Sequence, residues 1–475
     1  MSKDLRSFLA EYEKKHPEEV IHIEKEIGWD QEVTVIAQKF EKQEKYPILI
    51  FHNVRTCSGE KSPFPLITNL LASRNRCAEV IGSTFKMVGR DYYRKTREMR
   101  KPFTKISRGE APVKEVVKKG KEINLWEFPA IRHHYMDPGP YFTAGYFTTM
   151  HPTTGIDNCG LHRGWMVEKN IVRFYLTPHT HSRYTMNYHR DRNEPMRIAY
   201  WVGHHPAACL GGQVRLGYPE SHYASMGGLL EESLRVVPSE TLGENFLVPA
   251  DAEVIVEGII KDYTEYPEGP LGEYTGYIGP QIPNPQFEVT AITHRKDAYW
   301  HDILVGRVDN FVMGGFAIEG AVYEAVRQRI PSCVAAYLPV SGICRMHVYL
   351  QLEKPRRGDA KEAILTAIPV DFRLKHIFVF DTDIDIFNDK EAMFALATRT
   401  QWDKDVMIFT GARIAECDPT APDEGVMTKG GIDCTKPAEE NFSELNKTDD
   451  EVFDRIRLED FIPQKKLEAI PTERM

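Results

Sequence analysis

Long apolar runs, paired cysteines and a surplus of basic residues are all missing from this sequence. The longest apolar runs, such as residues 48–51, are far too short to cross a bilayer, and the charged N-terminal segment is unlike a signal peptide. The eight cysteines include no CxxC pair, which favours reduced thiols in the cytoplasm over a disulfide framework. A formal net charge of −9 argues against a nucleic-acid-binding protein. The sequence therefore predicts a cytoplasmic protein that neither spans a membrane nor binds nucleic acid.

Familiar cofactor and catalytic motifs are missing as well. The sequence contains no GxGxxG, Walker A, HExxH or GxSxG. Residues 381–392 begin like a calcium loop but lack its central glycine and its closing glutamate. Histidine pairs occur at 133–134, 179–181 and 204–205, and the HxH form of the second would place both rings on one side of a strand. No third nitrogen or sulfur ligand lies at a familiar spacing, so the pattern favours neither calcium nor zinc.

The chain is too long for one compact core, and its patterning changes twice. Residues 1–110 have α/β character, with an amphipathic helix at the start. Residues 111–310 carry short β-branched and aromatic segments broken by glycine and proline, which is typical of an antiparallel sheet or barrel. Residues 311–475 return to alternating helices and buried strands and end in an acidic, polar tail. We therefore expect an α/β (α+β) protein with three regions, and a tail that forms a surface helix or contacts a partner.

Three local assignments accompany this division. The pattern indicates a helix from about Leu66, because the apolar residues of PFPLITNLLASRNRCAEVIG recur at helical spacing. Residues 117–123, which are rich in lysine, are predicted to be a connector. A single helix is expected within the β-rich region, over residues 226–235.

The segment YPEGPLGEYTGY, residues 266–277, places Glu268 and Glu273 on either side of a Gly-Pro turn. On a straight strand this odd spacing would send the two side chains to opposite faces, but glycine and proline can bend the chain so that both face one pocket. Two neighbouring carboxylates cannot both ionise cheaply, so one keeps its proton near neutral pH while a buried arginine holds the other ionised. The alternative is a surface turn with solvated acids. The aromatic and apolar neighbours of the glutamates favour a lined pocket.

Five segments in order resemble the UbiD family of reversible decarboxylases, which use prenylated FMN. The first resemblance is EGPLGEYTGY, similar to the EGPFGE-type signature of that family, and the match extends from about residue 4 to residue 437. The other segments are IDNCGLHR with Asn158 and Arg163, TPHTH with His181, PESHYASMGG with Glu220, and GVMTKGGIDCTKP with Lys429.

The resemblance implies a fold and a set of cofactors. The fold is an N-terminal α/β segment, a central split β-barrel that binds flavin, and a C-terminal α/β domain that mediates oligomerisation. Asn158, His181 and Glu220 would hold Mn²⁺ or a similar divalent metal next to the cofactor phosphate, and an oxygen-rich set with one imidazole suits such an ion. A potassium ion would bind nearby, largely through backbone carbonyls, in the region of residues 211–214. The cofactor-binding set would be Asn158, Gly160, Leu161, His162, Arg163, His181, Glu220 and Lys429.

The resemblance also assigns the chemistry. Arg163, Glu268 and Glu273 would be catalytic, with Arg163 pairing Glu268 and with Glu273 as the proton donor. The reaction would be the reversible, non-oxidative decarboxylation of an aromatic or heteroaromatic acid through a covalent prenylated-FMN adduct, which supplies the electron sink that an sp² carbon lacks. A separate flavin prenyltransferase would supply the cofactor, and a homodimer or larger homo-oligomer is expected.

The substrate is predicted from the residues expected beside the pocket, which are Tyr274, His301 and Arg307. Their polar, cationic character favours a furan- or pyrrole-type carboxylate or a phenolic acid over plain cinnamate. Alternatively, His301 and Arg307 would form structural ion pairs with Asp302 or Asp309. Three other functions stay open at this point: an FMN-dependent split-barrel oxidoreductase, a metal-dependent hydrolase built on Asn158, His181 and Glu220, and a noncatalytic scaffold.

Overall fold

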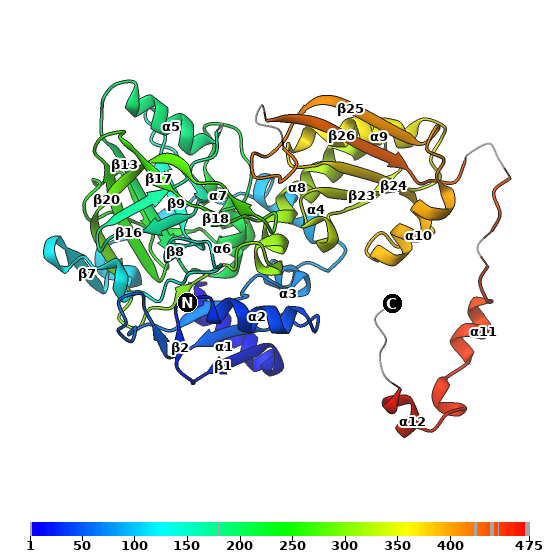
Figure 1. Cartoon of the computed structure of the whole chain (residues 1–475), viewed down its shortest axis with the longest axis horizontal. Coiled ribbons are helices and arrows are strands. Elements are labelled where there is room, and N and C mark those ends of the chain that lie inside the picture. Colours follow the sequence, from blue (N-terminus) through cyan, green and yellow to red (C-terminus); the bar gives the residue numbers. More distant parts are fainter. Residues whose placement is uncertain (1, 179, 422–424, 438–440, 445, 471–475) are drawn as a thin grey trace. The chain divides into compact units, whose positions relative to one another are not determined.

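The computed structural model describes residues 2–178, 180–421, 425–437, 441–444 and 446–470. Contacts between residues divide the chain into two compact units, Met1–Thr435 and Lys436–Met475. None of the described helices is both long enough and apolar enough to span a bilayer. The first unit contains the helices and sheets predicted for an α/β (α+β) protein, and its parts are drawn in Figure 1.

The N-terminal part is a small sheet flanked by helices. Its strands, in spatial order, are β1 (Val20–Ile23), β3 (Ile48–Phe51), β5 (Leu66–Thr68) and β21 (Trp300–His301). The flanking helices are α1 (Leu5–Lys15), α2 (Glu32–Glu41) and α3 (Arg74–Val80). The helix expected from Leu66 is wrong: residues 66–68 are a fully buried strand, and the helix begins only after Ser73, whose side chain caps it by accepting a hydrogen bond from the Arg76 N–H.

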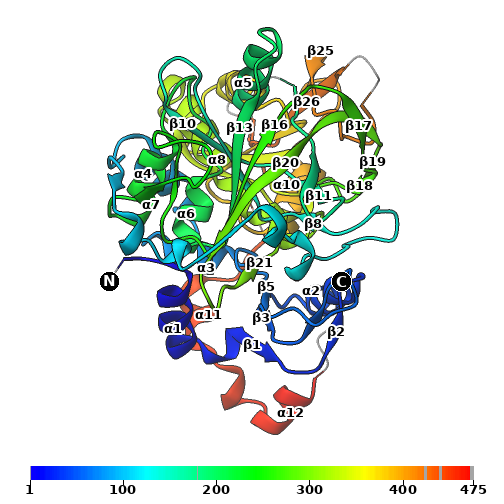
Figure 2. The same cartoon turned by 90° about the vertical axis from the view of Figure 1, so that its left-hand side faces the viewer.

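A ten-stranded, largely antiparallel sheet curls through the centre of the molecule (Figures 1 and 2). Its main path is β10-β9-β13-β16-β20-β12-β11-β8, and β7 and β17 also pair with β20. The strands are β7 (Val116–Lys119), β8 (Tyr141–Phe142), β9 (Tyr146–Met150), β10 (Asp157–Leu161), β11 (Gly164–Met166), β12 (Ile171–Phe174), β13 (Met196–Val202), β16 (Val254–Ile260), β17 (Glu265–Glu268) and β20 (Ile282–His294). This curled half-barrel confirms the predicted fold class.

Two assignments in this region need correction. The lysine-rich stretch predicted as a connector overlaps β7, because Val116–Lys119 pairs along its whole length with residues 291–294 at the end of β20. Lysines in such a strand fit an edge position. The single helix predicted over residues 226–235 is wrong in number and bounds: α7 spans His222–Leu230, and α5 (His181–Arg190) and α6 (Pro206–Gly211) lie in the same region. Helix α7 stops there because Glu231 adopts a left-handed backbone with φ of 60°, and Arg235 already belongs to a strand.

The C-terminal part is a second α/β layer. The long helix α8 (Val308–Arg329) packs on α4 (Val88–Arg97), and Gly320 permits the close approach because a Cβ there would lie 2.3 Å from the Gly89 carbonyl oxygen. The five-stranded sheet contains β22 (Cys333–Tyr337), β23 (His347–Leu352), β24 (His376–Asp381), β26 (Val426–Asp433) and β25 (Val406–Arg413), with helices α9 (Asp359–Ala367) and α10 (Asp389–Arg399).

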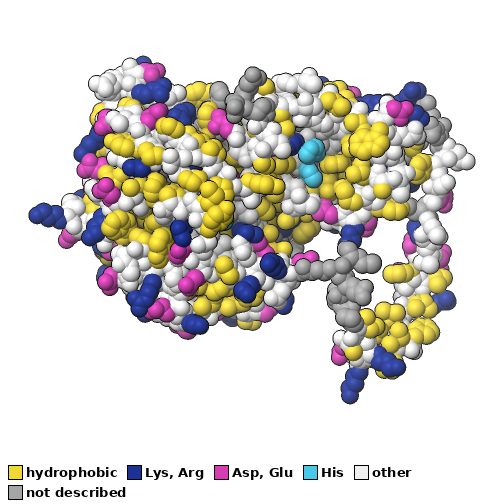
Figure 3. Space-filling model, viewed as in Figure 1, with side chains coloured by type: hydrophobic (Ala, Val, Ile, Leu, Met, Phe, Trp, Pro, Cys, Tyr) yellow, Lys and Arg dark blue, Asp and Glu magenta, His cyan; other side chains and the backbone are white. Residues whose placement is uncertain are grey.

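The second unit holds two short helices, α11 (Asp450–Arg455) and α12 (Gln464–Ala469). Large apolar side chains along it are exposed, including Phe453 at 73% and Phe461 at 69% (Figure 3). An exposed apolar segment of this kind is typical of a surface that contacts a partner.

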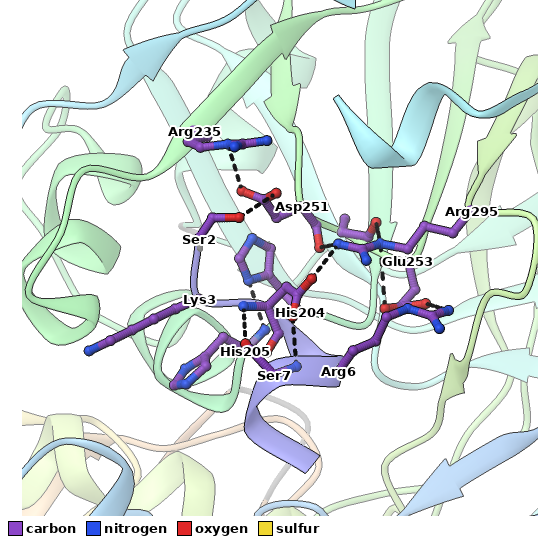
Figure 4. Close-up of polar contacts among 12 residues, drawn as sticks. Ser2, Lys3, Arg6, Ser7, His204, His205, Arg235, Asp251, Glu253 and Arg295 are labelled. Atoms are coloured by element: carbon purple, nitrogen blue, oxygen red, sulfur yellow. Dashed lines mark hydrogen bonds and ion pairs between the residues drawn. The ribbon is translucent and has the colours of Figure 1, made fainter. Parts of the chain in front are cut away.

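A polar network ties the N-terminus to the central sheet (Figure 4). Asp4 accepts from Arg295 Nη2 at 2.9 Å, Arg6 Nη2 donates to Glu253 at 3.1 Å, and Ser2 Oγ donates to Asp251 at 3.1 Å. The buried rings of His204 and His205 lie in the same region. Burial lowers the pKa of His204 to about 3 and that of His205 to about 4, so both rings are neutral in the folded protein.

Acid should destabilise the fold through these two rings. Each histidine has a folded pKa below its unfolded value, so its contribution to stability is present above about pH 6.5 and is lost as pH falls toward the folded pKa. We expect the loss to be on the order of 1 kcal/mol per pH unit for each ring. His205→Asn, which keeps an acceptor for the Ala207 N–H, should reduce the drop in melting temperature between pH 7 and pH 5.

The exposed His22→Asn variant is the control, since its ring makes contacts only at the surface. Equal acid sensitivity of the His205→Asn and His22→Asn proteins would contradict this interpretation.

Candidate functional site

Arg163 lies between Glu268 and Glu273 and contacts both. Its Nε is 3.0 and 3.1 Å from the two carboxylate oxygens of Glu268, and its Nη2 is 2.5 Å from Glu268 Oε2. Its Nη1 donates to Glu273 Oε1. The guanidinium thus makes a fork-like contact with one acid and a single contact with the other. The structure brings together the three side chains that the sequence predicted as catalytic.

The local chain path explains this convergence. Glu268 ends β17, which pairs with β20, and the chain then turns at Gly269, where φ is 83° and a side chain would be strained. The next short strand is β18 (Leu271–Gly272). Gly272 donates its N–H to Asp137 at 3.0 Å, and a Cβ there would lie 2.2 Å from His134 Nδ1. Glycine is therefore required at both positions to fold Glu273 back toward Glu268.

Burial and charge make Glu273 the acid of the pair. Burial raises the pKa of Glu273 above its usual value, Arg163 opposes that shift, and the neighbouring Glu268 adds to it. Burial alone would lower the pKa of Arg163, but the carboxylates of Glu273 and Glu268 outweigh it and the net shift is upward. Glu268 is fully buried and Arg163 is 9% exposed, so the contacts lie in a low-dielectric site.

Asn158 and His181 lie close together on neighbouring elements. Asn158 is on β10 and donates its amide to Ser182 Oγ at 2.9 Å, and Ser182 follows His181 at the start of α5 (His181–Arg190). His181 is therefore on a helix, not on the strand expected from the HxH pattern, and His179 lies outside the described residues. The strand assignment is wrong because Thr180 caps a helix at this point.

The charge of Glu220 acts on the imidazole of His181. Burial lowers the pKa of His181, and the carboxylate of Glu220 partly offsets that shift. A neutral imidazole is the form that binds a metal. Glu220 accepts from Arg100 Nη1 at 2.6 Å and from the Gly217 N–H at 3.0 Å. The donor set of an amide, a neutral imidazole and a carboxylate fits a manganese-like ion.

The remaining residues predicted to bind cofactor lie on two elements. Gly160, Leu161 and His162 follow Asn158 at the end of β10, and burial lowers the pKa of His162 to about 4. Lys429 lies on β26, is 3% exposed and donates to the Phe372 carbonyl at 2.7 Å. Burial lowers the pKa of Lys429 to about 8, which fits an ammonium group that an anion would stabilise.

The residues predicted to line a substrate pocket have different immediate neighbours, although Gly306, next to Arg307, packs against the Glu273 main chain, where a Cβ would lie 2.9 Å from the Glu273 carbonyl oxygen. Tyr274 follows Glu273, and its ring faces the Arg345 guanidinium at 4.8 Å. Its buried hydroxyl lies beside the Cys417 thiol and has no oxygen or nitrogen partner among the described residues. His301 is buried in β21, with neither ring nitrogen paired within the described residues. Arg307 contacts Glu41 at 3.5 Å.

The ion pairs suggested as an alternative for His301 and Arg307 are wrong. Asp302 instead contacts His133 at 2.7 Å, and Asp309 accepts from the Asn69 and Leu71 N–H groups. Asp302 and Asp309 contact residues that are distant in the sequence. Closeness in sequence to His301 and Arg307 therefore did not predict their partners.

Sequence reasoning missed several residues around the site. Asp137 accepts a hydrogen bond from the Gly272 N–H, and the Arg345 guanidinium lies over the Tyr274 ring. Neither belongs to a motif, and both reach the site only through long-range packing. Because a lone buried aspartate or arginine has no sequence signature, only the structure could reveal them.

Family models match most of the chain. They are described as the N-terminal, Rift-related and C-terminal domains of 3-octaprenyl-4-hydroxybenzoate carboxy-lyase, and they match residues 12–96, 104–308 and 311–434. The chain belongs to the UbiD family and is a carboxy-lyase. This membership favours the decarboxylase over the oxidoreductase, hydrolase and scaffold alternatives.

Two curated relatives are anhydromevalonate phosphate decarboxylases. The protein of Methanosarcina mazei is 31% identical over 417 residues, which cover 86% of this chain and 92% of the relative. That of Methanothermobacter thermautotrophicus is 30% identical over 328 residues, covering 69% of this chain and 77% of the relative.

Among solved structures, the UbiD-class enzyme HmfF from Pelotomaculum thermopropionicum in complex with FMN has a TM-score of 0.88 at 30% identity, covering 97% of this chain and all of that one. An evolved dimeric form of HmfF in complex with prFMN has a TM-score of 0.86, also at 30% identity, with the same coverage. The vanillic acid decarboxylase of Sedimentibacter hydroxybenzoicus, at 23% identity and a TM-score of 0.83, covers 98% of both chains and shares the fold.

Removing the guanidinium should destabilise the protein in a pH-dependent way. Arg163→Met leaves the carboxylates of Glu268 and Glu273 without their cation, so the already raised pKa of Glu273 moves further above the unfolded value of about 4.3. Stability is then retained below about pH 4.3 and lost as pH rises. We expect a loss of about 3–5 kcal/mol at pH 8, measured by chemical denaturation, and a smaller loss at pH 5.

The double variant Arg163→Met/Glu273→Gln is the matched comparison. It removes one of the two carboxylates that lack a counterion, so it should recover part of the free energy of unfolding that Arg163→Met loses at pH 8. A pH-independent loss, or no recovery in the double variant, would rule out a buried charge triad.

Proposed function

We propose that this protein is a prenylated-FMN-dependent, reversible decarboxylase in which Glu273 protonates the carbon that loses CO2. The contact of Arg163 with both Glu268 and Glu273 carries this proposal, because it places a largely buried acid with a raised pKa, 18% exposed at its side chain, beside a fixed cation. Relatives of the same architecture bind FMN and prFMN, which supports the choice of cofactor.

The residues present fit this cofactor and its metal. Lys429, a buried ammonium held by a single carbonyl, would bind the cofactor phosphate. Asn158, His181 and Glu220 would hold Mn²⁺ or a similar ion beside it, while Gly160, Leu161 and His162 would line the flavin. A potassium ion would use carbonyl groups near residues 211–214. Prenylated FMN, when bound, supplies an electron sink for the electron pair that the departing CO2 leaves behind.

The protein's own residues control one proton and the local charge. Arg163 pairs with Glu268 and fixes it, while burial and the nearby Glu268 carboxylate favour the protonated form of Glu273 against the opposing effect of Arg163. After CO2 leaves, the Glu273 carboxyl gives its proton to the substrate carbon, and in the reverse direction the carboxylate takes the proton back. Burial of the triad excludes water, which would otherwise screen these interactions.

For the substrate, we propose an unsaturated carboxylic acid, with two candidates. The resemblance in sequence favours an aromatic or heteroaromatic acid of the furan, pyrrole or phenolic type, with Tyr274, His301 and Arg307 near the pocket. The curated relatives at 30–31% identity act on anhydromevalonate phosphate, which supports an unsaturated acid that carries a phosphate. We favour the phosphate-bearing acid, because these relatives match most of the chain.

We propose two kinds of protein partner. A flavin prenyltransferase would supply the modified cofactor. Self-association into a homodimer or larger oligomer is supported by the exposed apolar side chains of residues 441–444 and 446–470 and by the evolved dimeric form of HmfF.

Glu273→Gln should reduce decarboxylation at least about 1,000-fold, because a neutral amide cannot supply the proton. Flavin content, measured by absorbance, should stay near that of the wild type. Tyr277→Phe, a change at an exposed side chain in the same segment, is the control. An active Glu273→Gln enzyme with bound flavin would contradict the assignment of the proton donor.

A substrate panel separates the two candidate acids. With protein produced together with a flavin prenyltransferase, CO2 release should be fastest from anhydromevalonate phosphate and slower from furoic, pyrrole-carboxylic and dihydroxybenzoic acids. Faster release from an aromatic acid would reverse the preference. No release from any of these acids by flavin-loaded protein would contradict the proposed reaction.

A further inference from the structure

Three arginines surround a single carboxylate next to the catalytic triad. Arg215 lies in the loop after α6 (Pro206–Gly211), Arg345 precedes β23 and Arg373 precedes β24. Arg373 contacts Asp371 at 3.0 and 3.2 Å, and Arg215 contacts the same carboxylate at 2.7 Å. Despite its burial, the pKa of Asp371 falls to about 2 because Arg373 and Arg215 stabilise its charge. Asp371 thus forms ion pairs with two of the three arginines.

Arg345 has no acidic partner among the described residues. It is 4% exposed, and its Nη2 and Nη1 donate only to main-chain carbonyls, those of Asn310 at 2.9 Å and of Ile343 and Phe311 at 3.3 and 3.4 Å. Its Nε is buried without a hydrogen bond within the described chain. A buried charge that lacks a counterion costs several kcal/mol unless a ligand supplies one.

The backbone before Arg345 is held in an uncommon conformation. Ile343 and Cys344 have φ values of 54° and 51°, a left-handed region that is unfavourable for a β-branched residue such as isoleucine. Strained backbone of this kind clusters at ligand-binding sites, where it positions a side chain. Here it directs the guanidinium of Arg345 to the ring of Tyr274.

Tyr274 connects this charge to the proton donor. It follows Glu273 directly, and its buried hydroxyl has only the weakly hydrogen-bonding Cys417 thiol beside it, with no oxygen or nitrogen partner among the described residues. An oxyanion placed beside Tyr274 could accept from both the hydroxyl and the free Nε of Arg345. Arg373 and Arg215 would add positive charge on the same side, since one aspartate neutralises only one of them.

We propose that Arg345, Arg373 and Tyr274 bind a second anionic group of the substrate, a phosphate or a carboxylate, remote from the carboxyl group that is lost. This inference rests on the proposed function and makes the substrate at least a dianion. It also assigns Arg345 as the residue that discriminates such acids from monocarboxylic ones, because a site with unpaired donors penalises a ligand that cannot satisfy them.

The cofactor phosphate is the competing source of negative charge. Lys429 contacts the Phe372 carbonyl and so lies near Arg373, whereas Arg345 contacts Tyr274 on the side of Glu273. We therefore assign Lys429 to the cofactor and Arg345 to the substrate. A test on flavin-loaded protein separates the two, because the cofactor phosphate then already occupies its own site.

The first experiment titrates inorganic phosphate into FMN-loaded protein and follows the melting temperature at constant ionic strength. Phosphate should raise the melting temperature of the wild type and not that of Arg345→Gln. Arg327→Gln is the matched control, since its guanidinium also donates to main-chain carbonyls and lies over a tyrosine ring, and it should respond like the wild type. No response in the wild type, or an equal response in Arg345→Gln, would overturn the inference.

The second experiment compares kcat/KM for anhydromevalonate phosphate with that for anhydromevalonate. The ratio should fall about 10- to 100-fold in Arg345→Gln, as expected for the loss of a charged hydrogen bond, and Arg345→Lys should restore part of it. An unchanged ratio would overturn the inference, as would loss of FMN binding in Arg345→Gln, which would reassign the arginine to the cofactor. Phosphate binding without decarboxylation of any acid would instead contradict the proposed reaction and leave the anion site standing.

Discussion

The contact of one buried guanidinium with two glutamates is the constraint on which the site depends. Arg163 lies in the short link between β10 and β11, whereas both acids flank a turn more than one hundred residues later. The contact therefore exists only when the curled sheet has formed. The triad carries one positive charge against two potential negative charges. Burial raises the free-energy cost of the second negative charge. The same burial raises the pKa of Glu273, so that this side chain favours its protonated form.

Positive charge lies next to the same turn. The Arg345 guanidinium lies over the Tyr274 ring, the charge of Arg373 also acts on Tyr274, and Asp371 neutralises only part of that charge. The segment 266–277 thus adjoins both a region that stabilises a proton on an acid and a region that would attract an anion. A substrate with a carboxyl group at one end and a second acid at the other would match both regions.

The sequence predicted the fold class and the three residues of the triad, because the informative residues lie in short segments. The paired acids around Gly-Pro predicted the turn, and periodicity predicted α1, α8 and the buried strands of the C-terminal sheet. The errors arose where tertiary pairing decides: Leu66 joins a sheet, β7 pairs with distant β20, and Arg307 meets Glu41 across domains. Arg345 belongs to no motif, so the sequence could not predict that this arginine is buried without a counterion among the described residues. The domain limits at residues 110 and 310 and the catalytic roles stay predictions.

The protonation state of Glu273 tests the central claim most directly. Infrared difference spectra of flavin-loaded protein, recorded against pH, can detect a protonated carboxyl group. The signal should persist above the pH at which an exposed glutamate ionises, disappear in Glu273→Gln and survive in Asp137→Asn. A carboxyl signal that titrates like that of an exposed glutamate, or one that Glu273→Gln leaves intact, would contradict the claim that burial and the neighbouring Glu268 make Glu273 the proton donor.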